Sequence, residues 1–168
     1  MKARTTTIVG FGAAALVALS ATPSEALNTV RSWPRGTSYI YVSEGGVNQG
    51  RAYGTWKVAD TSNGTRSIAS ANLQDLRVGG NSIYVELQTQ SNSGICFSPE
   101  YTSCNQTWYN YSMDQTGRSN SDRWVTLGAS TGVDNSDQYA RGVLKVCEDQ
   151  AYSPDPCSGW TYTYGDIY

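Results

Sequence analysis

The segment Tyr139–Cys147 constrains this chain most, because it has the pattern of a half-buried strand and leads directly into a loop bounded by cysteines. Small or apolar residues occupy every second position, namely Ala140, Gly142, Leu144 and Val146. Arg141 and Lys145 alternate with them, and this period of two predicts a strand with one buried face. Two prolines before Cys157 stop the ladder from continuing, since proline has no backbone N–H to donate.

Most of the remaining chain also has strand-like patterning, broken by turn-forming residues. We expect seven further strands, at Thr37–Ser43, Arg51–Val58, Ser67–Leu76, Ile83–Thr89, Thr107–Met113, Arg123–Leu127 and Trp160–Tyr164. Ser67–Leu76 also has apolar residues at helical spacing, and its neighbours on both sides favour the strand. We expect Gly45–Gly50, Asp60–Gly64, Asp114–Asp122 and Gly128–Asp137 to be turns or loops, and Leu27–Gly36 a loosely held arm.

About eight short strands without a convincing amphipathic helix predict an all-β fold, a single antiparallel β-sandwich. Its core should contain the residues on the apolar side of each alternating strand. These are Trp56, Ile83, Val85, Leu87, Val125, Leu144 and Val146.

Residues 1–26 have the pattern of a secretory signal peptide. Lys2 and Arg4 precede the apolar run Ile8–Leu19, and Ser24-Glu25-Ala26 places small residues at a cleavage site. The apolar run is shorter than the ~20 residues that a spanning helix needs, so no membrane span is expected. Residues 27–168 then form one secreted, extracellular domain.

The charge of the expected mature chain argues against a nucleic-acid partner. Without Lys2, Arg4 and Glu25, ten basic and thirteen acidic residues remain of the chain's 12 and 14, a net charge of −3. No two basic residues are adjacent there, whereas sequence-independent nucleic-acid binding needs several cations on one face.

The four cysteines, an even number in an exported chain, predict two disulfides rather than a metal site or a catalytic thiol. Three pairings are possible. The spacing favours two local bridges, Cys96–Cys104 and Cys147–Cys157, because each pair flanks a turn-rich segment that contains proline.

Two parts of the sequence together resemble a loose set of small exported bacterial proteins. The parts are Gly50–Trp56 and the ending Val143–Asp149 with Pro154-Asp155-Pro156-Cys157. The resemblance implies a signal peptide, one β-sandwich-like domain and a last strand that enters a Cys–Pro-Asp-x-Cys loop. It implies no function, and the pair Cys96 and Cys104 is not part of the pattern.

The chain has no histidine, which excludes Ser-His-Asp triads, Cys-His pairs and His-ligated zinc. Glu86 and Asp75 are the carboxylates nearest to a glycosidase pair, although acids on the outer face of a sheet usually only contact solvent. Asp134–Asp137 and Asp114–Asp122 supply oxygen ligands for calcium without matching a full ligand-spacing motif. We therefore predict no catalytic residues, no metal and no cofactor.

Aromatic residues two apart are the strongest indication of function, because on a strand they lie on one face. Trp160, Tyr162 and Tyr164 would form a row of three rings on an edge strand, and Tyr39 and Tyr41 a shorter one. Such rows suit sugar rings or other extended polymers, although the rings can instead pair across strands. The leading hypothesis is a non-catalytic domain that binds a polysaccharide, the cell envelope or an extracellular protein. A structural surface protein and a small carboxylate-dependent glycoside hydrolase are the alternatives.

Overall fold

The computed structural model describes residues 29–36, 38–92, 107–134, 136 and 139–166. Nine strands in this part of the chain form two antiparallel sheets. The five-stranded sheet contains β1 (Arg31–Trp33), β2 (Ile40–Glu44), β3 (Val47–Thr61), β4 (Gly64–Asp75) and β7 (Val125–Gly132). The four-stranded sheet contains β5 (Ser82–Asn92), β6 (Tyr109–Gln115), β8 (Tyr139–Asp149) and β9 (Thr161–Asp166).

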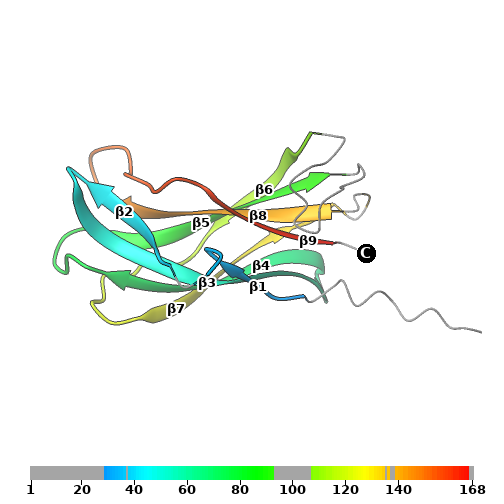
Figure 1. Cartoon of the computed structure of the whole chain (residues 1–168), viewed down its shortest axis with the longest axis horizontal. Helices are drawn as coiled ribbons and strands as arrows, with labels where there is room; N and C mark the ends of the chain where they lie inside the picture. The colour runs from blue at the N-terminus through cyan, green and yellow to red at the C-terminus, as the bar shows by residue number, and fades with distance from the viewer. Residues whose placement is uncertain (1–28, 37, 93–106, 135, 137–138, 167–168) are drawn as a thin grey trace, which may run out of the picture.

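The two sheets lie face to face and enclose one core, as in a sandwich (Figure 1). All eight predicted strands are present at shifted boundaries, and the ambiguous Ser67–Leu76 is a strand. Of the seven predicted core residues, all but Val125 are buried. Val125 is only partly covered because it begins β7 at an end of the sheet. The all-β prediction is therefore confirmed, with nine strands where about eight were expected.

Three segments that were predicted to be an arm, a turn and a loop instead contain residues that pair into strands. Leu27–Gly36 contains β1, whose Trp33 is buried opposite Gly54. The turn predicted at Gly45–Gly50 shrinks to Gly45 and Gly46, whose positive φ angles suit a two-residue hairpin, so β3 already begins at Val47. The loop predicted from Gly128 is β7 as far as Gly132, where small side chains pair with β4.

The indole of Trp56 fills the space between the sheets because glycines face it. A Cβ at Gly142 would lie 2.5 Å from Nε1 of Trp56, and a Cβ at Gly165 would lie 3.1 Å from its ring. The Trp56 Nε1–H donates to the Ser67 hydroxyl at 2.7 Å, so the one polar atom of this buried ring is satisfied.

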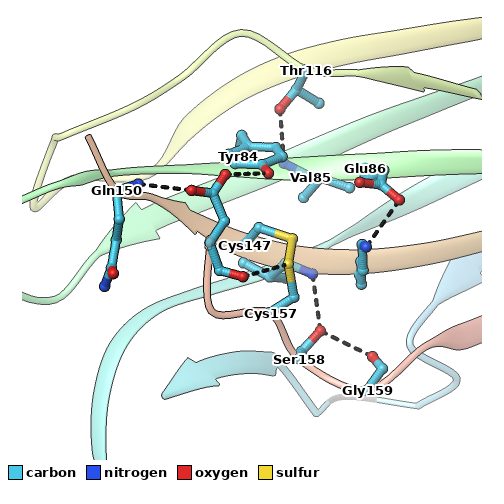
Figure 2. Close-up of a disulfide and its surroundings, with 12 residues drawn as sticks. Tyr84, Val85, Glu86, Thr116, Cys147, Gln150, Cys157, Ser158 and Gly159 are labelled. Atoms are coloured by element: carbon cyan, nitrogen blue, oxygen red, sulfur yellow. Dashed lines mark hydrogen bonds and ion pairs between the residues drawn. A yellow bond between two sulfur atoms is a disulfide. The ribbon is translucent and has the colours of Figure 1, made fainter. Parts of the chain in front are cut away.

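The predicted disulfide Cys147–Cys157 is present and closes the loop between β8 and β9 (Figure 2). Asp155 holds this loop in place, since it accepts the backbone N–H of Gln150 at 2.9 Å and the Tyr84 hydroxyl at 2.7 Å. These two bonds lower the pKa of Asp155. Burial, and then the bond to Asp155, raises the pKa of Tyr84. The segment that leads into β9 is therefore tied to β5 and β8.

Cys96 and Cys104, the signal-peptide segment 1–26, Asn135 and Asp137 lie outside the described residues. The second predicted disulfide and the cleavage site stay predictions. Within the described part of the chain, no helix is long and apolar enough to cross a membrane.

Candidate functional site

The predicted row of three rings lies along β9, the strand at one edge of the four-stranded sheet. Tyr162 and Tyr164 pair with Val143 and Arg141 of β8, and Trp160 directly precedes β9. Trp160 and Tyr162 are each 41% exposed, while Tyr164 is half-buried. The Tyr162 and Tyr164 rings lie 6.5 Å apart at only 20° to each other. We call Trp160, Tyr162 and Tyr164 the β9 platform.

Two cations of β8 lie against the rings of the β9 platform. The guanidinium of Arg141 lies 4.9 Å from the Tyr162 ring centre and 4.5 Å from that of Trp108, and its Nε donates to Gln90 at 2.6 Å. Lys145 Nζ lies 4.3 Å from the Trp160 ring centre. Cation–π contacts of this kind restrict the orientation of a ring.

A second aromatic group lies on the outer face of the five-stranded sheet. Tyr39 and Tyr41 were predicted as a pair, and their rings meet edge to face at 6.3 Å. Tyr53 of β3 and Trp124, which directly precedes β7, join them; the Tyr53 and Trp124 ring centres are 5.0 Å apart at 80°. Arg51 lies 4.6 Å from the Tyr39 ring and 5.0 Å from Trp124. These five residues are called the Arg51 cluster below.

A cleft of about 350 Å³ adjoins the Arg51 cluster, and it arises from the way β3 is paired. β1 and β2 share one edge of β3, with Trp33 opposite Gly54 and Ile40 opposite Ala52. Tyr53 is the single position of β3 between these two pairings. The cleft beside it is lined by Ser32, Trp33, Pro34, Gly36, Ser38, Tyr39, Tyr53 and Gly54.

The two carboxylates considered for catalysis do not lie on open surfaces as expected. Glu86 is 8% exposed and forms an ion pair with Lys145 at 3.0 Å (Figure 2). Asp75 is 1% exposed, and its Oδ1 accepts the backbone N–H of Arg77 at 2.7 Å. They lie on β5 and β4, strands of different sheets. A glycosidase pair must face the substrate from both sides of a cleft, and this pair does not.

In the described parts of the two loops considered for calcium, the carboxylates of Asp134 and Asp114 accept hydrogen bonds from other residues. Asp134 accepts both the backbone N–H and the hydroxyl of Ser136, and these bonds lower its pKa. Asp114 accepts the backbone N–H of Ser130 at 2.9 Å. Among the residues that the structure describes, no three His, Cys, Asp or Glu side chains group as a metal site would require.

Sequence reasoning placed Arg51 and Tyr53 on one strand, correctly, and yet missed the cluster that they form. The missing information is long-range, since Tyr39, Tyr53 and Trp124 come from three separate segments. Strand register brings them together, and the register between distant strands cannot be read from local sequence patterns. No protein-family model matches this chain, and no curated protein or solved structure matches it.

Proposed function

We propose that this protein is a secreted, non-catalytic domain that binds a polysaccharide of the extracellular space or the cell envelope through the β9 platform. The observation that carries the proposal is a row of rings along an edge strand, in which Trp160 and Tyr162 are exposed and the rings of Tyr162 and Tyr164 are nearly parallel. Flat rings in a row offer apolar faces to successive sugar rings of one chain, while the polar atoms of Tyr and Trp stay available for sugar hydroxyls.

The cations beside the rings support this proposal. Arg141 and Lys145 come from β8, which pairs with β5 along eleven positions. Rings held by neighbouring cations lose little conformational freedom when a ligand binds, and such preorganisation increases affinity.

The disulfide Cys147–Cys157 supports the secreted part of the proposal, because such bonds persist in oxidising compartments. The predicted signal peptide agrees with it. The same ring contacts also favour a second candidate, a structural surface protein whose rings only pack on the sheet, since Trp108 and Tyr164 meet at 6.0 Å. The experiment below separates the two.

The test is retention on insoluble polymers, namely cellulose, chitin and purified bacterial cell walls. We expect the wild-type domain to be retained on at least one of them and Trp160→Ala to be lost from it, with an unchanged thermal midpoint. Tyr152→Ala is the matched control, because Tyr152 is fully exposed in the disulfide loop and outside the platform. Retention of Trp160→Ala equal to wild type contradicts the platform, and failure of the wild type to bind supports the structural alternative.

A further inference from the structure

The two outer faces of the molecule repeat one arrangement, an arginine beside a glutamine among aromatic rings. Arg51 is directly opposite Gln74 in the β3–β4 pairing, and its Nε and Nη2 donate to Oε1 of Gln74 at 2.9 and 2.7 Å. Arg141 is directly opposite Gln90 in the β5–β8 pairing and donates to it at 2.6 Å. The arrangement thus occurs once in each sheet, on unrelated strands.

Neither arginine has its charge neutralised by a neighbour in the described part of the chain. No carboxylate there lies within ion-pair distance of Arg51 or Arg141, whereas Lys145 pairs with Glu86 and Arg118 with Asp149. Glutamine orients a guanidinium through its carbonyl oxygen without neutralising it. A guanidinium has five N–H donors, so each of these arginines keeps donors beyond those that its glutamine occupies.

Ring contacts distinguish these two arginines from the other cations without an ion pair. The chain is acidic overall, with 12 basic and 14 acidic residues, and each of these two positive charges lies against at least two aromatic rings. A planar guanidinium binds a carboxylate through two parallel hydrogen bonds, and it stacks on aromatic rings at the same time. The charge and the rings together suit a ligand that offers both a carboxylate and an apolar ring face.

We infer that the ligand is an acidic polysaccharide whose uronate carboxylates pair with Arg51 on one face and with Arg141 on the other. The inference rests on the proposed function and names its substrate class. The β9 platform takes consecutive residues of the chain, and the cleft beside Tyr39 and Tyr53 takes a single residue or a chain end. Its volume of about 350 Å³ lies at the small end of the range for ligand sites.

One loop adjoins both sites, which places them within reach of the same polymer. Pro34 and Gly36 line the cleft, and between them the guanidinium of Arg35 lies 5.7 Å from the Tyr164 ring of the β9 platform. A chain that leaves one site therefore passes this loop before it reaches the other. Two linked sites raise the apparent affinity for a long polymer above that for a short one.

The test measures binding to polygalacturonate and to alginate by calorimetry, each against the same polymer after chemical reduction of its carboxyl groups. Reduction keeps the backbone and removes the charge. We expect at least one of the acidic polymers to bind about tenfold more tightly than its reduced form, with an affinity that falls as salt is added. Arg51→Gln and Arg141→Gln should each lose about five- to tenfold, and the double variant more.

Arg66→Gln is the matched control, because Arg66 lies on β4 of the five-stranded sheet and bonds to Ser130 without a ring contact in the described structure. Its affinity should equal that of wild type. If acidic and reduced polymers bind equally, or if only neutral polymers bind, the inference of an acidic ligand is wrong, while the proposed polysaccharide binding still holds. If no polymer binds, both the inference and the proposed function are wrong. Folded Arg51→Gln and Arg141→Gln proteins with wild-type affinity overturn the assigned contacts.

Discussion

The Arg51 cluster and the β9 platform use the same residue types on the two outer faces and arrange them differently. In the Arg51 cluster the rings come from separate segments and mostly meet edge to face, as Tyr53 and Trp124 do. In the β9 platform the rings follow one another along one edge, and Tyr162 and Tyr164 are nearly parallel. Rings from one strand follow one another in a row, whereas rings from several strands meet at angles beside a cleft.

The supports of the two surfaces differ as well. The Arg51 cluster rests on the crowded β3–β4 pairing, where Gly54 leaves room for Trp33. The β9 platform rests on an edge strand and on a loop closed by Cys147–Cys157. The first surface therefore depends on core packing, and the second depends on a covalent link and on local hydrogen bonds.

The largest expected loss of stability comes from substituting alanine for a buried glycine beneath one of the two surfaces. A Cβ at Gly54 would lie 1.9 Å from the Ser70 carbonyl oxygen, a backbone atom that cannot move aside, while one at Gly165 meets only the Trp56 ring at 3.1 Å. We expect Gly54→Ala to lower the free energy of unfolding by about 3 kcal/mol or more, and Gly165→Ala by about 1 kcal/mol. Urea titration measures both. Equal losses of unfolding free energy in the two variants would mean that the Arg51 cluster and the β9 platform do not differ in how they are supported.

Removal of the disulfide should change the structure around the β9 platform more than the structure around the Arg51 cluster. Replacing both Cys147 and Cys157 by alanine should lower the free energy of unfolding by about 2.5–3 kcal/mol, since the unfolded chain loses a constraint. In spectra of the folded variant we expect the indole N–H signal of Trp160 to shift and broaden. The Trp124 signal should stay in place, and a comparable change there would refute separate supports.

The ring contacts themselves can be compared through double-mutant cycles. Tyr53 and Trp124 meet edge to face at 5.0 Å, so their coupling energy should be about 0.5–1.5 kcal/mol. Tyr162 and Tyr164 are 6.5 Å apart, and their coupling should stay below about 0.5 kcal/mol. Alanine substitutions, singly and together, with urea unfolding provide the values. Stronger coupling in the second pair would make it a packing unit rather than a platform.

The smallest expected effect is a pH dependence of stability that arises from Asp155, in the loop that leads to the β9 platform. Bonds from the Gln150 N–H and the Tyr84 hydroxyl lower the pKa of Asp155 in the folded state. The stabilisation is present above the unfolded pKa of about 3.9 and is lost as the pH falls through the lower folded value. Asp155→Asn should flatten the acid side of the stability–pH curve between about pH 5 and 2. An unchanged curve would show that Asp155 does not tie down the loop.

Alternating segments were predictable because one buried face leaves a period of two in the sequence. Ile83, Val85 and Leu87 are all buried, as their alternation requires. β1 was not predictable, since three residues are too few to show a period and only Trp33 among them is apolar. Gly54 hints at the missing strand, because a glycine at an inward position leaves room for a large partner.

The candidate site was predictable to the extent that it lies on one strand. Tyr162 and Tyr164 share a face by local geometry alone. Arg51 and Trp124 meet only because β3, β4 and β7 pair in a particular register, which is a long-range property. The burial of Glu86 depends likewise on Lys145 of β8, so its exposure could not be read from β5 alone.

The connection between β1 and β2 can vary without disturbing the two sheets. The strands on either side are anchored independently, β1 by the buried Trp33 and its bond to the Thr55 carbonyl, β2 by the buried Val42. We therefore expect an insertion between Pro34 and Tyr39 to leave the strand register and the core contacts unchanged. Homologues or designed variants can alter the length and composition of this segment, and with it the shape of the cleft, while the two sheets stay the same.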